Sequence, residues 1–212
     1  MAVAMLRPVI AKQDFTYRDY VALPEDGTRW EIIDGELYMM AAPHPAHQWI
    51  QTELSNRLYN FLKNRRCRVF TAPFDVAFAF KKEKTDDIKN VVQPDIIVFC
   101  GSPKSKDLGG RRIPDIAIEI LSPSSGNIDR IKKFQLYQQA GIKEYWLVDG
   151  AIESIEVYSH DGKAFIRHGS YSATDTVTSA VLEGFEFAAS EVFPTEEEHE
   201  YLEWLKVDRS QI

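Results

Sequence analysis

The stretch Ile113-Pro114-Asp115-Ile116-Ala117-Ile118-Glu119-Ile120-Leu121 is apolar on both faces of an extended chain, apart from its two acids. A strand of this composition is typical of the interior of a sheet that is covered on both sides. Alternate residues share a face of a strand, so Glu119 should project away from the isoleucines. A carboxylate in such a place costs free energy unless a cation or hydrogen-bond donors lie beside it.

A second apolar run, Val91-Val92-Gln93-Pro94-Asp95-Ile96-Ile97-Val98-Phe99, carries another acid. Asp95 is expected near the start of a strand beside the first one, where it can meet Glu119 across the ladder. Taken alone, each acid is equally well explained as a hydrogen-bonded structural group. Two of them on adjacent strands indicate a site that binds a cation.

A helix predicted over residues 128–140 supplies a basic group for this site. Asp129, Lys133 and Tyr137 are spaced by four and form one column on that helix. If the helix packs over the sheet, Lys133 can reach the two acids. Hard oxygen ligands in small number, with room for waters and phosphate, suit Mg²⁺ or Mn²⁺ rather than zinc.

Composition sets wider limits. The chain has 212 residues, 44% of them hydrophobic, which is enough for one sizeable core. Its apolar runs are too short to span a bilayer and its start lacks the order of a secretory signal, so we expect a cytoplasmic protein that does not enter a membrane. Cys67 and Cys100 are too few for a disulfide framework or a zinc cluster, and we expect both to be small apolar core residues in a reducing compartment.

The net charge of −7 disfavours a protein that coats itself onto nucleic acid. It does not exclude a local basic groove, because phosphate contacts need only a cluster of basic side chains. Such clusters occur within residues 63–68, 81–84, 111–112 and 130–133. Each is also explained as solvated surface.

The organisation predicted is a single mixed α/β domain over residues 14–194, after an N-terminal extension (1–13) and before an acidic tail or helix (195–212). A hairpin is expected over residues 30–40, because Asp34-Gly35 is a strong two-residue turn signal. The remaining elements are expected as a short helix at 16–23, a long helix from Pro43, one strand over 69–80, a buried strand at 145–149 and a C-terminal β meander at 155–178.

In this order and spacing, several segments resemble the Uma-type putative restriction endonuclease family, within the PD-(D/E)XK nuclease superfamily. The likeness is carried by residues 30–37, 43–47, 93–95, 119–124, 129–137 and 140–149. It implies an α+β, restriction-endonuclease-like fold, in which a mixed central sheet is flanked by helices. It also implies a Mg²⁺- or Mn²⁺-dependent endonuclease that hydrolyses phosphodiester bonds in nucleic acid, DNA above all.

The resemblance assigns roles to individual residues. Asp95 and Glu119 match the two metal-binding acids, and the backbone carbonyl of Ile120 matches a further ligand. The superfamily usually has lysine two residues after the second acid, where this chain has Leu121. The likeness therefore assigns the catalytic lysine to Lys133 of the next helix, and Lys132 stays open as the alternative. Glu31 matches an acid of the first motif, as a further ligand or a group that orients a metal-bound water.

Other readings stay open. Glu31 can be a hairpin acid paired with a surface lysine, and His47 is better explained as a satisfied core or rim histidine than as a ligand. Asp115 is expected to be a solvated cap at the entry of its strand. The remaining candidates, expected in core or turn positions, are Tyr137, Tyr145, Trp146, Ser122 and Ser124.

Two other functions are consistent with the sequence. One is a nuclease-fold protein that binds nucleic acid or a protein partner without cutting, which the departure at Leu121 and the acidic net charge favour. The other is a hydrolase acting on another phosphorylated substrate. A homodimer is expected from the superfamily, since enzymes that cut both strands often pair. The choice of DNA, RNA or a branched substrate, the recognition sequence and the number of metal ions are not determined by the sequence.

Overall fold

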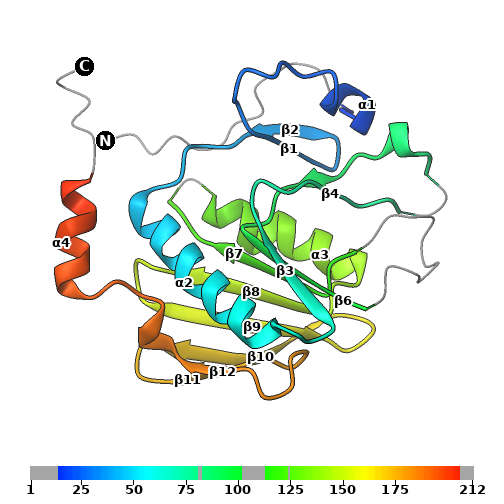
Figure 1. Ribbon diagram of the computed structural model, residues 1–212. Helices are drawn as coiled ribbons and strands as arrows, with labels where there is room; N and C mark the ends of the chain where they lie inside the picture. Colours follow the sequence, from blue (N-terminus) through cyan, green and yellow to red (C-terminus); the bar gives the residue numbers. More distant parts are fainter. Residues whose placement is uncertain (1–13, 81–82, 102–112, 124, 206–212) are drawn as a thin grey trace.

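The computed structural model describes residues 14–80, 83–101, 113–123 and 125–205. Its central sheet has six strands in the order β10-β9-β8-β7-β6-β3 (Figure 1). The strands are β3 (Cys67–Thr71), β6 (Ile96–Cys100), β7 (Ile116–Ile120), β8 (Glu144–Asp149), β9 (Ser154–His160) and β10 (Phe165–Ser172). β7 and β8 are parallel and the other neighbours are antiparallel. This is the mixed central sheet that the sequence predicted.

Two smaller sheets accompany it. One has the order β2-β1-β5-β4, and the other pairs β11 with β12. Their strands are β1 (Trp30–Ile33), β2 (Glu36–Met39), β4 (Val76–Ala77), β5 (Val91–Val92), β11 (Thr176–Thr178) and β12 (Glu186–Ala188). The predicted hairpin is β1–β2, and Asp34 and Gly35 turn it with φ of 51° and 77°. Both values are positive, as a tight type I′ turn requires.

Helices cover the two faces of the central sheet, with α2 in front of it and α3 behind it in Figure 1. α2 (Pro45–Leu62) begins after the cap His44 and buries its stripe of Ile50, Leu54, Leu58 and Leu62. This stripe packs in one core with Ile116, Ile118 and Ile120 of β7. The isoleucine face of β7 therefore faces α2.

The other face of β7 is covered by a π-helical turn, η3 (Ile128–Lys133), which continues directly into α3 (Phe134–Ala140). Leu136 and Tyr137 pack there against Ala117 of β7 and Tyr145 of β8. Gly141 ends the helix in the left-handed conformation, with φ of 77°, where a glycine carries no steric penalty. This side of the sheet, away from the isoleucines, is where the sequence placed Glu119.

The remaining short elements lie around these layers. α1 (Tyr17–Tyr20), η1 (Thr85–Asp87) and η4 (Ala189–Glu191) are single turns, and α4 (Glu196–Trp204) is the C-terminal helix. α1 is shorter than the helix predicted over 16–23. Thr195 caps α4 and forms a capping box with Glu198, so the described part of the acidic segment is a helix rather than a tail. The predicted division into domain and extensions stays a prediction.

The strand predicted over residues 69–80 is wrong. The chain leaves the central sheet after β3 and enters the smaller sheet as β4, where Val76 pairs with Val92. Pro73, whose bond to Ala72 is cis, lies between the two strands and has no amide hydrogen for a ladder. The run over residues 91–99 divides in the same way at Gln93-Pro94, into β5 and β6.

The prediction for the two cysteines is also wrong. Cys67 of β3 and Cys100 of β6 stand directly opposite each other, with their Cα atoms 4.0 Å apart, and form a disulfide. Sequence reasoning missed it because only the register of two strands that lie 33 residues apart brings the thiols together. In the described part of the chain, every helix is too short or too polar to span a membrane.

Candidate active site

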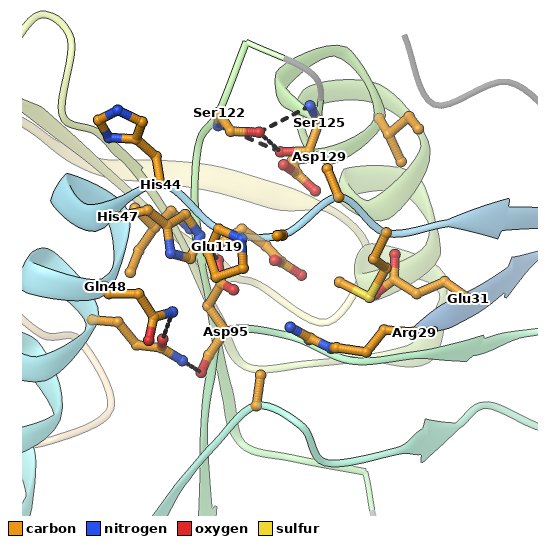
Figure 2. A pocket seen from close by; sticks show the side chains of 18 of the residues that line it. Arg29, Glu31, His44, His47, Gln48, Asp95, Glu119, Ser122, Ser125 and Asp129 are labelled. Carbon is orange, nitrogen blue, oxygen red and sulfur yellow. Dashed lines mark hydrogen bonds and ion pairs between the residues drawn. The ribbon is translucent and has the colours of Figure 1, made fainter. Parts of the chain in front are cut away.

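A cavity of about 390 Å³ opens at the end of β7, between the β1–β2 hairpin, the first turns of α2 and η3 (Figure 2). Its walls are formed by side chains from elements that are far apart in the sequence. The ionisable residues of interest are Glu31, Asp95, Glu119, Asp129 and Lys133. The structure therefore gathers the predicted acids and the predicted lysine around one space.

Strand pairing places the two central acids. β6 and β7 are antiparallel with Ile96 opposite Ile118, so Asp95 and Glu119 occupy the next pair at the end of the ladder. Asp95 Oδ2 accepts a hydrogen bond of 2.8 Å from the backbone N–H of Ile120, which fixes the carboxylate at the rim of the sheet. Both carboxylates are nearly buried, with residue exposures of 8% for Asp95 and 3% for Glu119. The predicted meeting across the ladder is present.

Lys133 lies at the centre of the acids. Its Nζ is 3.0 Å from Glu119 Oε1, 3.0 Å from Glu31 Oε1 and 3.4 Å from Asp129 Oδ1. Lys132 instead contacts Glu36 on the outside of the molecule, and 40% of its side chain is exposed. Of the two lysines left open by the sequence, the structure brings Lys133 to the acids and directs Lys132 away from them.

Negative charge exceeds positive charge in this cluster. Burial raises the pKa of Glu119 well above its ordinary value, with Lys133 opposing the shift and the neighbouring acids adding to it. Burial likewise raises the pKa of Asp129 to about 6, again against Lys133. Burial alone would lower the pKa of Lys133, but Glu119 and Glu31 outweigh it and hold that pKa well above the ordinary value. The ammonium stays charged while the acids remain only partly compensated.

This donor set fits the divalent cation that the sequence predicted. Carboxylate oxygens are hard ligands, and Asp129 Oδ1 forms no hydrogen bond with the described residues beyond its 3.4 Å ion pair with Lys133. Within the same residues, no three of His, Cys, Asp and Glu converge as a ready-made cage.

Glu31 and Ile120 have defined surroundings. Glu31 is 2% exposed, and its Oε1 accepts a hydrogen bond of 2.7 Å from Gln93 N as well as the contact with Lys133. The alternative of a hairpin acid paired with a surface lysine is thus wrong, because the partner lysine is buried. Ile120 lines the cavity and its N–H holds Asp95. The predicted roles of Glu31 and of the Ile120 carbonyl stay predictions.

Two further residues contact the central acids. Tyr137 donates a hydrogen bond of 2.6 Å to Glu119 Oε1. His47 lies on the other side, with Nε2 3.1 Å from Asp95 Oδ2, while its Nδ1 is buried without a partner among the described residues. The prediction of core packing for Tyr137 is confirmed. The hydrogen bond of its hydroxyl to Glu119 was not predicted, although the sequence placed Tyr137 on the same face of the helix as Lys133. The satisfied histidine predicted at position 47 is satisfied at only one nitrogen.

Four other predicted residues lie in strand, turn or core positions, and one of them, Ser122, also lines the cavity. The prediction that Asp115 is a solvated cap is wrong. Asp115 is 8% exposed and accepts hydrogen bonds from Cys100 N at 2.5 Å and Lys143 Nζ at 2.7 Å. Ser122 belongs to the predicted turn and hydrogen-bonds Ser125. Ser124 lies outside the described residues. Tyr145 and Trp146 are fully buried, as expected for core residues.

Known proteins similar to this chain were found by sequence and by structure. The family described as "Uma2: Putative restriction endonuclease" matches residues 17–190. Two uncharacterized proteins of Synechocystis sp. are similar: slr1290 is 26% identical over 181 residues, covering 80% of this chain and 90% of that protein. The second, sll1609, is 25% identical over 151 residues, covering 69% of this chain and 81% of that protein.

A solved structure shares the fold. It is the crystal structure of a putative nuclease belonging to DUF820 from Anabaena variabilis ATCC 29413, with a TM-score of 0.66 and 22% identity. The superposition covers 84% of this chain and 97% of the other. At this identity the likeness shows the fold, which confirms the predicted class of mixed sheet flanked by helices.

Proposed function

Because the chain belongs to the Uma2 family of putative restriction endonucleases, we propose that it is a metal-dependent nuclease that hydrolyses phosphodiester bonds in DNA. The observation that carries the proposal is the buried Lys133 ammonium, held among acids at the wall of a cavity that also exposes Asp95. The family description supports the choice of DNA, since restriction endonucleases act on it.

In this proposal Asp95 and Glu119 would hold Mg²⁺ or Mn²⁺, with the Ile120 carbonyl as a further ligand. Such an ion, when bound, lowers the pKa of a water ligand and offsets charge on a phosphodiester. Lys133 stabilises the negative charge that develops on the phosphate, and its raised pKa keeps it protonated for this purpose. Glu31 and Asp129 position the ammonium, which both contact.

The test compares two neighbouring lysines. Lys133→Met should lower the rate of cleavage of supercoiled and linear DNA, in Mg²⁺ or Mn²⁺, by about 10³-fold, as loss of a group that stabilises transition-state charge does. Lys132→Met removes the same charge from the exposed pair with Glu36 and should leave the rate within about twofold of the parent, because exposed ion pairs contribute little. Circular dichroism of both variants checks that they fold.

Asp95→Asn provides a second variant, since it keeps the size of the side chain. A Lys133→Met or Asp95→Asn protein that cuts DNA as fast as the parent contradicts the proposal. A folded parent that cuts neither DNA nor RNA and shows no Mg²⁺ or Mn²⁺ binding by calorimetry supports the alternative, a nuclease-fold protein that binds nucleic acid or a protein partner without cutting. The homodimer stays a prediction, for which light scattering in solution is the measurement.

A further inference from the structure

Arg29 is a second basic residue at the wall of the cavity, and its surroundings differ from those of Lys133. It precedes β1, and its backbone carbonyl accepts a hydrogen bond of 2.9 Å from Met40 N across the hairpin. Figure 2 shows its side chain extending from the hairpin toward the cavity, on the side opposite α2. The hairpin therefore fixes the backbone of Arg29, and its side chain extends to the wall of the cavity.

Among the described residues, one hydrogen bond holds the guanidinium group. Arg29 Nε donates to Gln93 Oε1 at 2.8 Å. Gln93 is itself oriented, because its Nε2 donates to Asp75 Oδ1 at 2.8 Å and to the Tyr20 hydroxyl at 3.1 Å. A planar guanidinium fixed at Nε has its two Nη atoms fixed in direction as well.

The charge of Arg29 is not balanced by an ion pair with any described residue. Nη2 is buried and forms no hydrogen bond with any described residue. In the same part of the chain Arg29 takes part in no ion pair, although four carboxylates line the same cavity and three of them are committed to Lys133. A buried donor that carries charge and lacks a partner is costly, so its position is best explained by a ligand that supplies the missing anion.

We propose that Arg29 binds a phosphate of the substrate in the ground state, as the anchor that sets affinity, while Lys133 acts on the reacting phosphate. A guanidinium pairs with two phosphate oxygens at once, and the half-buried Arg29 lines the cavity in which the phosphate would lie. This inference rests on the proposed function, since it takes the ligand to be a nucleic-acid phosphate. It gives the two residues different roles: Lys133 is already paired with acids of the protein, and Arg29 has no ion pair among the described residues.

The test measures KM and kcat separately for DNA cleavage. Arg29→Met should raise KM about 10- to 100-fold, the effect of one charge-assisted contact, and change kcat less than about threefold. Arg29→Lys keeps the charge but not the fork, and should raise KM by about threefold to tenfold. Arg167→Met is the matched control: it removes the same charge from an exposed position on β10, at the far edge of the central sheet.

A second measurement does not depend on cleavage. In EDTA, inorganic phosphate should raise the unfolding midpoint of the parent and of Arg167→Met relative to sodium chloride of equal ionic strength, and should not do so for Arg29→Met. If Arg29→Met matches Arg167→Met in KM and in its response to phosphate, the anchor role is refuted while the nuclease proposal stands. If no protein cuts but the phosphate response is lost only in Arg29→Met, the anion site stands and the nuclease proposal falls.

Discussion

Glu119 and Glu144 are buried carboxylates on the neighbouring parallel strands β7 and β8, with exposures of 3% and 0%, yet they are stabilised in opposite ways. Neutral donors surround Glu144: Trp146 Nε1 at 2.5 Å, Ser179 Oγ at 2.8 Å and the N–H groups of residues 180 and 181 at 2.6 and 2.9 Å. Glu119 shares one lysine with other acids and faces a cavity.

The comparison shows what distinguishes a structural acid from a candidate catalytic one. Burial raises the pKa of both, and at Glu144 the donors of Trp146 and Ser179 oppose the shift without adding charge. At Glu119 the neighbouring acids add to the shift, because more carboxyl groups than ammonium groups meet there among the described residues. Burial of an acid is thus common to both sites, and surplus charge beside an open space is found at only one of the two.

The largest effect is expected from Glu119→Gln. The amide keeps the shape but cannot serve as an anionic ligand, so the rate of DNA cleavage should fall by about 10³-fold. Because the change removes one of several crowded negative charges, the free energy of unfolding in EDTA should stay the same or rise. Single-turnover cleavage and urea unfolding measure the two quantities. A variant that cuts normally, or that loses several kcal/mol, would place Glu119 with Glu144 as a structural acid.

Glu144→Ala should have the opposite profile. It leaves Trp146 Nε1, Ser179 Oγ and two backbone N–H groups without their acceptor, so the free energy of unfolding should fall by about 3 kcal/mol. The cleavage rate, measured well below the unfolding temperature, should remain that of the parent, because Glu144 lies outside the cavity. A large loss of cleavage in a folded Glu144→Ala protein would remove the distinction between the two sites.

Asp129→Asn tests the surplus charge through pH. The pKa of Asp129 is about 6 in the fold against 3.8 for the free side chain, so the folded state binds the proton more tightly. Its contribution to stability is therefore full below pH 3.8 and is lost as pH rises through about 6. Relative to Asp129→Asn, the free energy of unfolding of the parent should fall by about 2 kcal/mol between about pH 4.5 and about pH 7.5 in EDTA. If urea unfolding gives the parent and Asp129→Asn the same dependence of unfolding free energy on pH, the cluster carries no surplus charge.

The parts of this comparison that the sequence predicted are those with a local pattern. The alternation in β7 predicted the direction of Glu119, and the spacing of four predicted that Lys133 and Tyr137 share a face of their helix. Both patterns are properties of one element, so they are visible without the fold. The juxtaposition of Asp95 and Glu119 followed from adjacent strands in sequence.

What the sequence did not predict depends on partners that are distant along the chain. The donors of Glu144 come from residues 179–181, the lysine partner of Asp115 lies 28 residues away, and Cys67 meets Cys100 only through strand register. The repeat of apolar and polar residues within one helix or strand carries no information about such pairs. The contact of His47 with Asp95, which joins two elements over 48 positions, was not predicted either, and neither was the place of Arg29 at the cavity.

The smallest effect is expected from Tyr137→Phe, which removes only the hydroxyl that donates to Glu119. Cleavage should fall about tenfold and unfolding free energy by about 1 kcal/mol, because Glu119 keeps Lys133 and loses one neutral donor. Tyr145→Phe is the matched control: its ring lies 5.0 Å from that of Tyr137, and its hydroxyl donates instead to the backbone carbonyl of Asp129. It should lose similar stability and keep the parent rate. Equal rates for the two variants would show that the hydroxyl on Glu119 serves packing alone, as the neutral donors do at Glu144.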